Sequence, residues 1–400
     1  MRADAASRGF LVLLVALSML GPLTLNILVP TIPSLPEALN TSRENAQLTL
    51  SLYLFGMAVS QLILGPLADR FGRRPVVLVA LVIYVLASLS AHFAPNIQAL
   101  IAARVFQSFG ASAGLTLGRT MIRDQYEQST AASMIGYVTM AMVIAPMVSP
   151  LLGATIDETF GWRAILGFCA VLGVLSFSLA WAILPETRPA SLVAATARQV
   201  IGRTLSLVVN VRYMGYWGAS AFCSALFFGF LGTAPHLMID VLGYSKSQYG
   251  WYFMSLSLGY MIGNFVSARL ARRVGIDRLV YWGNVAGLVG SAAIFVPALM
   301  GILHPLTLFG PAMIMSFGNG LVLPNAIAGG IGVDPRAAGA GSGLMGFGQV
   351  GVGAVLSFVA ATYSKESALP LASMMMVCAV IAHVAGWVSR QPLLEKWPAR

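Results

Sequence analysis

The chain has 400 residues, of which 58% are hydrophobic and only 10% are charged, and its mean hydropathy is +0.80. A water-soluble protein of this length needs a more polar surface, so the composition excludes a soluble globular domain and indicates an integral membrane protein. The formal net charge of +10 does not indicate nucleic-acid binding, because the basic residues are scattered among short loops without interleaved aromatic residues.

Apolar stretches long enough to cross the roughly 30 Å hydrocarbon core of a bilayer recur along the whole sequence. The first is too long for the apolar region of a signal peptide, and prolines follow it where a cleavage site would stand, so a membrane helix is predicted there. Twelve spanning helices are predicted, at residues 10–32, 46–67, 76–93, 97–118, 131–154, 162–184, 213–235, 247–268, 279–300, 306–331, 339–363 and 369–389.

One loop is longer than the others and divides the chain six spans from six. The predicted organisation is an N-terminal six-helix bundle at 1–184, a connector at 185–212 and a C-terminal six-helix bundle at 213–400. Part of the connector is predicted to form a basic amphipathic helix on the membrane surface. Assigning the loops alternately to two sides places 19 of the 24 basic residues on the side of both termini, which the positive-inside rule predicts to be cytoplasmic.

The stretch GPLADRFGRRP at 65–75 joins the second and third spans and is unusually charged. Gly65 and Pro66 are predicted to end one helix, Gly72 to permit a tight turn, and Asp69 to accept hydrogen bonds from a neighbouring helix end or an arginine. Such charges would latch two helices only while the cytoplasmic side is closed; alternatively, the arginines serve only topology. The predicted gating loop consists of Gly65, Asp69, Arg70, Gly72, Arg73 and Arg74.

Arg104 is the one basic residue well inside a predicted span, where a charge costs about 2.5 kcal/mol or more unless it faces protein or water. Gln107 and Ser108 share its helical face and complete a polar stripe. We predict that Arg104 organises a polar cavity and senses protonation of a nearby group. In the alternative, Arg104 reaches outward to the membrane interface or caps a helix end.

The fifth span carries Pro146, Pro150 and Gly153 at spacings of four and three residues. These residues form one stripe that is predicted to bend the helix, allow close packing and seal the two halves on the outer side. Proline and glycine are common in membrane helices, so the alternative is structural packing alone.

The halves also share a repeat, since LADRFGRR at 67–74 and LARRVGID at 270–277 stand at equivalent places. A parallel six-plus-six repeat is typical of secondary transporters, with the binding site near the bilayer midplane. The pattern G-x-x-x-D-R-x-G-R-R resembles the major facilitator superfamily signature, and further motifs resemble its Bcr/CflA-type drug:proton antiporters. These motifs are QLILGPLADRFGRRPVVL (61–78), RVFQSFGAS (104–112), GRTMIRD (118–124), APMVSPLLG (145–153), GWRAIL (161–166), GNGLVLPNA (318–326) and AGAGSGLMGFGQ (338–349).

The resemblance implies a twelve-helix major facilitator fold and export of small amphipathic compounds in exchange for protons. One position departs from the pattern: in GPLTLNILVPTIPSL at 21–35, Asn26 stands where the group usually carries an aspartate. An asparagine cannot bind and release a proton, and none of the 14 acidic residues lies deep within a predicted span. Asn26 is itself predicted to contact the substrate, and the alternative is a structural hydrogen bond between helices. Further candidate contacts to the substrate are Tyr53 and Asn325.

Three interpretations of the missing acid stay open. His236 carries the proton, Asp69 or an outer carboxylate couples more weakly, or the protein is a uniporter or uses another gradient. The four histidines show no metal spacing and no span holds paired carboxylates, so neither an enzyme nor a cofactor or metal site is expected.

Among carriers, an importer of a small metabolite is the main alternative to an exporter. The expected partners are a small amphipathic substrate, protons and the lipid bilayer, without nucleic acid. A monomer in a bacterial inner membrane is expected, since one chain suffices for the mechanism.

Overall fold

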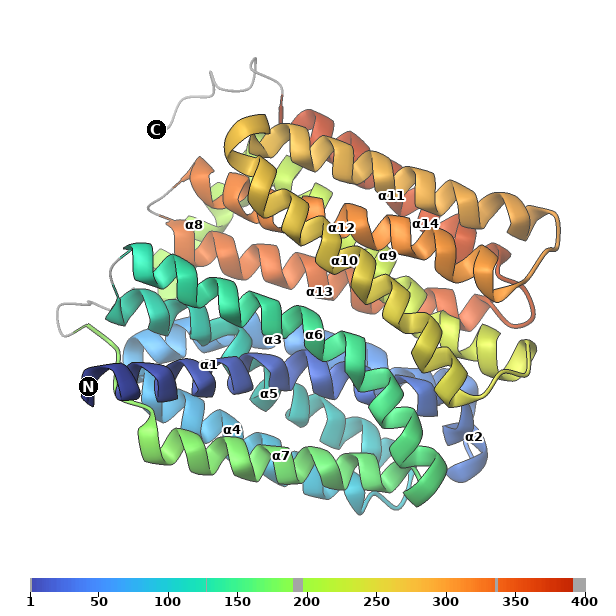
Figure 1. The fold of residues 1–400 in the computed structure, drawn as a ribbon, viewed down its shortest axis with the longest axis horizontal. Helices are drawn as coiled ribbons and strands as arrows, with labels where there is room; N and C mark the ends of the chain where they lie inside the picture. Colours follow the sequence, from blue (N-terminus) through green and yellow to red (C-terminus); the bar gives the residue numbers. More distant parts are fainter. Residues whose placement is uncertain (1, 127, 190–196, 335–336, 391–400) are drawn as a thin grey trace. The chain divides into compact units, whose positions relative to one another are not determined.

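The computed structural model describes residues 2–126, 128–189, 197–334 and 337–390 (Figure 1). Within these ranges every regular element is a helix, which agrees with the predicted all-α fold class. Residues 190–196 of the predicted connector lie outside the described residues. The chain divides into two compact units: unit 1 is Met1–Ala195 with Gly243–Trp251, and unit 2 is Thr196–Leu242 with Tyr252–Arg400.

Unit 1 is built from helices that pack mainly around α5. The strongest packing joins α5 to α4 and α3, followed by that of α1 against α6 and of α4 against α7, and α1 also packs against α5. Its elements are α1 (Arg2–Ile27), η1 (Val29–Ser34), α2 (Leu35–Ala38), α3 (Arg43–Phe71), α4 (Arg73–His92), α5 (Ile97–Gln125), α6 (Gln128–Phe160) and α7 (Trp162–Ile183).

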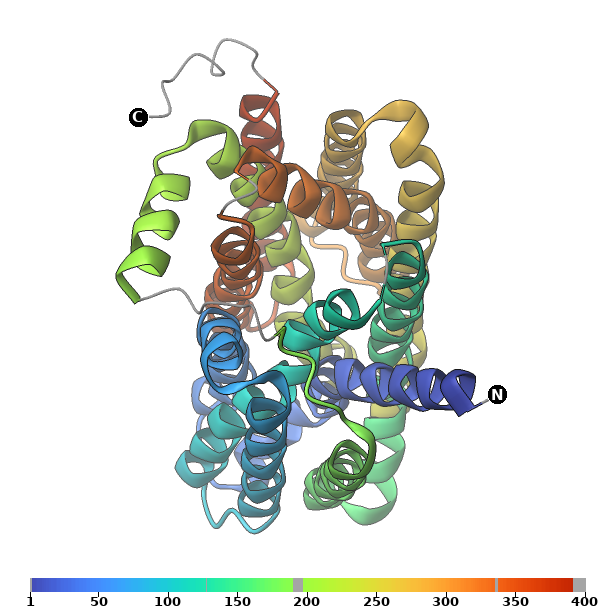
Figure 2. The same cartoon turned by 90° about the vertical axis from the view of Figure 1, so that its left-hand side faces the viewer.

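Unit 2 is organised around α9, which packs against α12, α13 and α14, while α11 packs against α12 and α14. Its elements are α8 (Ala197–Val208), α9 (Val211–His236), η2 (Leu237–Val241), α10 (Lys246–Val274), α11 (Ile276–Leu299), α12 (Pro305–Val333), α13 (Ala338–Tyr363) and α14 (Leu369–Val388). The first turns of α10 belong to unit 1. Figure 2 shows that α8, the helix in the connector, runs across the direction of α9.

Twelve helices in the described part of the chain have 20 residues or more, and each overlaps one predicted span. Ten of them, the first continued through η1 and α2 and another through η2, are also apolar enough to cross a bilayer. The other two are α6, with 33 residues, and α10, with 29, and both are long enough to span. The tyrosine, glycine and serine residues of α10 lower its mean hydropathy.

The first predicted span is not one continuous α-helix. The α-helix α1 ends at Ile27, and the chain continues as a 3-10 helix over Val29–Ser34 that contains Pro30 and Pro33. Proline has no backbone N–H to donate to the preceding turn, so these two residues interrupt the α-helical hydrogen bonds.

The predicted helix end at Gly65 and Pro66 is wrong. Helix α3 continues through Pro66 to Phe71 and ends at Gly72, whose φ is 102°. An internal proline costs one backbone hydrogen bond, which membrane helices tolerate when neighbouring groups compensate. The positive φ of Gly72 turns the chain out of the helix, a conformation that side chains with a β-carbon rarely adopt.

Candidate substrate site and charged network

The charged network of unit 1 surrounds the turn at Gly72. Arg73, the first residue of α4, is 4% exposed, and its guanidinium group pairs with Asp69 of α3. Its Nε also donates to Asp124, near the end of α5, at 3.2 Å. The predicted role of Asp69 as an acceptor from an arginine is therefore seen, and Asp124 is a partner that the sequence motif did not reveal.

Glu186 is the second residue that sequence reasoning missed. Its carboxylate accepts the backbone N–H groups of Arg73 at 2.9 Å and Arg74 at 3.2 Å, so it caps the first turn of α4. It also accepts the N–H of Arg188 at 2.9 Å, and the guanidinium group of Arg188 donates to the carbonyl of Arg70 at 3.0 Å. The signal in the sequence is an acidic residue directly after an apolar span, within LPETRP.

Arg74 and Arg70 lie at the edge of this network. Arg74 donates to the carbonyl of Trp181 on α7 at 3.0 Å, and its guanidinium carbon lies 6.0 Å from the centre of that ring. Arg70 is exposed and lies over the ring of Phe71, at 5.3 Å. The network thus joins α3, α4, α5 and the end of α7 within unit 1.

We expect Glu186→Gln to lower the thermal stability of the protein at pH 7. Partial burial pushes the pKa of Glu186 upward, but the N–H groups of Arg188, Arg73, Arg74 and Thr187 outweigh it and hold the pKa below its ordinary value of 4.5. A lowered pKa means that the stabilisation is complete above 4.5 and is lost as the pH falls through the folded-state pKa. Unfolding midpoints of both proteins from pH 7 to 3 should converge at the acid end; a difference independent of pH would contradict this.

The matching turn in unit 2 has the same backbone conformation. Helix α10 ends at Val274, Gly275 has a φ of 87°, and α11 begins at Ile276. The carboxylate of Asp277 accepts from the hydroxyl group of Tyr216, and its carbonyl accepts from Arg390 Nη2 at 2.6 Å. The sequence repeat between 67–74 and 270–277 therefore corresponds to a repeated turn, with different side-chain partners.

Arg104 lies on α5 inside unit 1 and is only 1% exposed. Its Nη1 donates to the carbonyl of Thr24 on α1 at 3.2 Å and to Oε1 of Gln107 at 2.6 Å. Its guanidinium carbon lies 4.1 Å from the centre of the Tyr53 ring on α3, a cation–π contact. This placement does not fit the alternative in which Arg104 reaches outward or caps a helix end.

The polar cluster around Arg104 continues to α4. Nε2 of Gln107 donates to Ser88 Oγ at 2.8 Å, and Ser88 donates to the carbonyl of Tyr84 at 2.7 Å. The hydroxyl groups of Tyr84 and Thr24 lie 2.7 Å apart, which closes the cluster back onto α1. Ser108, by contrast, donates to the carbonyl of Val105 in its own helix.

Asn26 and Tyr53 are both buried in unit 1. Nδ2 of Asn26 donates at 2.8 Å to the carbonyl of Pro22 in the same helix, and its Oδ1 is buried without a partner among the described residues. The Tyr53 hydroxyl group donates to the carbonyl of Gly21 at 3.4 Å. Asn26 therefore has unused acceptor capacity at the position where the resemblance leads us to expect an acid.

His236 ends α9 and contacts two acceptors. Its Nδ1 lies 2.7 Å from the Asp240 carboxylate, and its Nε2 lies 2.6 Å from the carbonyl of Lys365. A neutral imidazole has a single N–H, so the ring can donate to both partners only when it carries a positive charge. Asn325 in unit 2 is different: its Nδ2 donates to Ser267 Oγ at 2.7 Å and joins α12 to α10.

The predicted stripe on α6 contacts α1. A β-carbon at Gly153 would overlap the carbonyl oxygen of Ile27, so only glycine allows the two backbones to approach this closely. Pro150 is buried and Pro146 is half-buried, and the helix continues through both. Figure 1 shows that α6 changes direction along its length.

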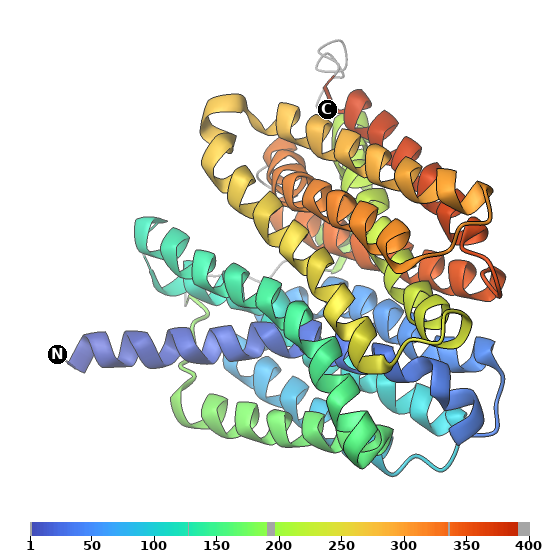
Figure 3. The same ribbon diagram turned by 45° about the vertical axis from the view of Figure 1, so that its right-hand side comes forward.

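A buried ion pair joins the start of α10 to the ends of η1 and α6 within unit 1. Lys246 Nζ lies 2.6 Å from the carboxylate of Asp157, whose side chain is 6% exposed. Thr31 donates to the same carboxylate at 2.8 Å, and Lys246 also donates to Ser34 at 3.0 Å. Figure 3 shows the start of α10 beside the end of α6. No local pattern in the sequence pairs these two residues, which are 89 positions apart.

We expect Lys246→Ala to destabilise unit 1 by roughly 1 to 3 kcal/mol, because it leaves the buried Asp157 carboxylate without its cation. The value lies below that for a fully buried pair, since Lys246 is 21% exposed. The unfolding midpoint in detergent measures the effect. Lys365→Ala is the matched control, because its side chain is exposed and has no ion pair with any residue that the structure describes; an equal loss in both variants would contradict the prediction.

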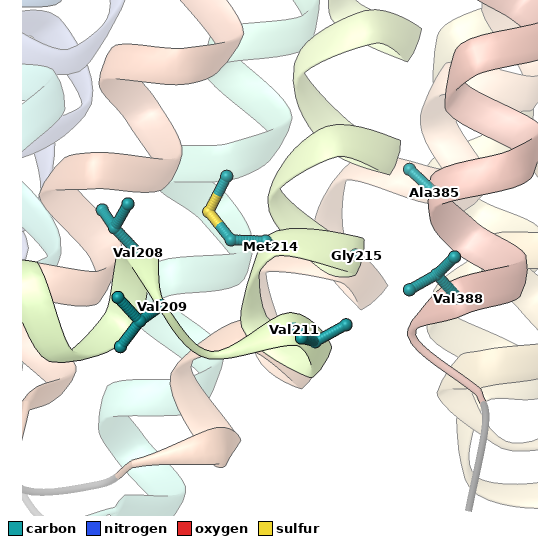
Figure 4. A pocket seen from close by; sticks show the side chains of 7 residues that line it. All are labelled: Val208, Val209, Val211, Met214, Gly215, Ala385 and Val388. Atoms are coloured by element: carbon teal, nitrogen blue, oxygen red, sulfur yellow. The ribbon is translucent and has the colours of Figure 1, made fainter. Parts of the chain in front are cut away.

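A shallow groove of about 380 Å³ lies where the connector enters α9. Four valines, Met214, Gly215 and Ala385 line it, contributed by the segment from α8 to α9 and by α14 (Figure 4). A substrate site needs a few placed polar groups among apolar ones. The groove offers no polar side chain, so the Arg104 cluster is the better candidate substrate site.

Long apolar helices in two units, together with a buried polar cluster around one arginine, define a polytopic α-helical transporter. Residues 14–358 match the Major Facilitator Superfamily, and the chain belongs to this family. The predicted membership in its Bcr/CflA-type group is confirmed by the curated relatives described next.

Several bacterial proteins are similar to this chain along most of its length. The bicyclomycin resistance protein homolog of Haemophilus influenzae is 26% identical over 377 residues, which are 94% of each chain. Multidrug resistance protein D of Escherichia coli is 31% identical over 344 residues, 84% of each chain. The chloramphenicol resistance protein of Pseudomonas aeruginosa is 29% identical over 312 residues, 76% of this chain and 72% of the relative.

Solved structures support the fold. A peptide transporter, POT, solved with sulfate is similar with a TM-score of 0.78 and 15% identity, covering 95% of this chain and 93% of that one. The xylose transporter XylE of Escherichia coli is similar with a TM-score of 0.73 and 12% identity, covering 95% and 96%. At these identities the likeness establishes the shared fold alone.

Proposed function

We propose that this protein is a secondary active transporter that exports small amphipathic compounds by alternating access. The buried polar cluster around Arg104 carries the proposal, because a buried charge inside a membrane helix is costly and marks a substrate or ion pathway. The names of the relatives, which refer to resistance to bicyclomycin, chloramphenicol and multiple drugs, support drug-like compounds as the exported class.

The proposed topology follows from the charge distribution. When the loops are assigned alternately to two sides, the loops at Gly72 and Gly275 fall on the side that holds most of the basic residues, so we place these loops and both termini in the cytoplasm of a bacterial cell. In this proposal the bundles at 1–184 and 213–400 alternate about a site at the membrane midplane, with 185–212 as the connector and a single chain as the working unit.

We also propose that transport is coupled to protons. Asn26 cannot carry the proton, because an amide does not bind and release one. His236 is the first candidate, because its ring lies between a carboxylate and a carbonyl and loses one of these bonds on deprotonation. Asp69 in the charged network and Asp157 beside Lys246 are the other candidates.

The second candidate function is an importer or uniporter of a small metabolite without proton coupling. One observation favours it: Asn26 stands where the Bcr/CflA-type group carries an acid, and it bonds only within its own helix among the described residues. An uncoupled carrier needs no titratable group in the membrane-spanning part of unit 1.

Everted membrane vesicles acidified by respiration test the two functions. Chloramphenicol, ethidium and a fluoroquinolone are added one at a time while the pH gradient is followed with a fluorescent weak base. We expect each transported drug to reduce the pH gradient in vesicles that contain the protein. Vesicles that contain the Arg104→Ala variant should keep the gradient. Accumulation of labelled drug without loss of the gradient would contradict proton coupling, and no flux of any compound would contradict export.

A further inference from the structure

The guanidinium group of Arg104 has no carboxylate partner among the residues that the structure describes. Both of its hydrogen bonds come from Nη1, and they go to a carbonyl oxygen and to the amide oxygen of Gln107. The remaining contact, with Tyr53, covers a face of the guanidinium plane and uses none of its N–H groups. The charge is therefore held in place by neutral groups and is not neutralised by them.

The unused donors lie on one edge of the group. Nε is buried without a hydrogen-bond partner, and Nη2 makes no bond within the described part of the chain. Nε and Nη2 carry the two parallel N–H bonds that a carboxylate accepts as a bidentate pair. Nη1 anchors the guanidinium from the other side, so the free edge has a fixed orientation.

Burial makes the unpaired charge of Arg104 costly. Arg104 is only 1% exposed and lies within a membrane-spanning helix, where an unneutralised charge is disfavoured by at least about 2.5 kcal/mol. An anion that bound the free edge would recover part of this cost, whereas a cation brought to the same place would be repelled. The cluster therefore discriminates between ligands by charge.

We propose that the substrate site around Arg104 takes organic anions, with a carboxylate of the substrate on Nε and Nη2. The inference rests on the proposed transport function and names the substrate class of its site. Tyr53 supplies an aromatic surface beside the charge, which suits a carboxylate attached to an aromatic ring system.

Two dyes with the same ring system test the charge preference. Fluorescein carries a free carboxylate and is an anion, while rhodamine 123 has this carboxyl group blocked as an ester and is a cation. Binding is measured by fluorescence anisotropy with the purified full chain in phosphatidylcholine nanodiscs, which contain no anionic lipid. We expect the protein to bind fluorescein at least about tenfold more tightly than rhodamine 123.

Three variants assign this preference to Arg104. Gln107→Glu places a carboxylate on Nη1 without changing side-chain size, and Arg104→Lys keeps the charge but removes the bidentate edge. Each is expected to reduce the ratio of the two affinities about tenfold. Gln349→Glu, which adds the same charge on α13 of unit 2, is the matched control and should leave the ratio unchanged. Thermal unfolding confirms that each variant is folded.

The inference would be overturned if the protein bound rhodamine 123 as tightly as fluorescein or more tightly, or if it bound neither dye. It would also be overturned if the ratio of the two affinities were unchanged in Gln107→Glu and Arg104→Lys. Stabilisation by sodium chloride alone, equal to that by fluorescein, would also overturn it, because the anion would then be inorganic. Export of ethidium, which is a cation, and of a fluoroquinolone, which carries a carboxylate, at equal rates would leave the proposed function intact and refute only the anion site.

Discussion

Replacing Arg104 with alanine is expected to lower transport about 100-fold while the protein still inserts in the membrane. The variant loses two hydrogen bonds from a charged donor, each worth at least about 1.5 kcal/mol, and every 1.4 kcal/mol corresponds to a tenfold effect. It also leaves the Tyr53 ring and the Gln107 amide without their shared partner. Fluoroquinolone efflux from cells and the amount of protein in the membrane fraction measure the two effects separately.

Arg104→Lys separates the role of the charge from that of the guanidinium geometry. Lysine keeps a positive charge but cannot reach the Thr24 carbonyl and the Gln107 amide with one planar group. We expect normal insertion and a loss of transport nearly as large as that of Arg104→Ala. Wild-type drug resistance in either variant, at equal protein abundance, would refute a central role for Arg104 in transport.

Replacing Gly72 with valine is expected to stall the transport cycle, with turnover reduced at least tenfold. A β-branched residue at a φ of 102° is strained by about 1 to 3 kcal/mol, and its β-carbon would lie only 2.5 Å from the carboxylate of Glu186. The helix cap on α4 and the ion pairs of Arg73 depend on this turn. Turnover in vesicles and drug binding to the purified protein are measured side by side, and binding should remain.

Gly65→Val is the matched control for the Gly72 variant, because the structure places Gly65, a residue of the predicted gating loop, inside α3 and outside the turn. Gly65 lies in the same segment, but no atom lies within 4 Å of the place where its β-carbon would be, and its φ is not positive. This variant should therefore transport normally. Asp69→Ala, which removes one of the two partners of Arg73, should fall between the two glycine variants. Undiminished turnover in Gly72→Val would contradict the gating role of the loop.

The sequence was sufficient to predict the helices because bilayer thickness sets their length. Each apolar stretch has the size that a spanning helix needs, and the interrupted one at Pro30 and Pro33 is the visible exception. The turn at Gly72 was also predictable, because a glycine between two charged helix ends readily adopts the positive φ that a tight turn requires. The error at Pro66 arose because a rule for water-soluble helices was applied to a membrane helix.

The partners in the candidate site were less predictable, because they are distant in sequence. Glu186 and Arg73 are 113 residues apart, and Lys246 and Asp157 are 89 apart, so no local pattern links them. Arg104 was identified because a charge inside an apolar span is conspicuous, but the free edge of its guanidinium group depends on Thr24 and Gln107, whose positions only the fold supplies.

The order of the Arg104 contacts along the chain bears on how the protein is made. Thr24, Tyr53 and Ser88, which build the cluster on α1, α3 and α4, all precede Arg104 in the sequence. During synthesis these helices leave the ribosome first, so these polar partners have been made before the arginine emerges. Helix α5, which carries the charge, can then pack against protein instead of lipid. We expect substitutions in α1 that disturb this contact to impair the insertion of α5.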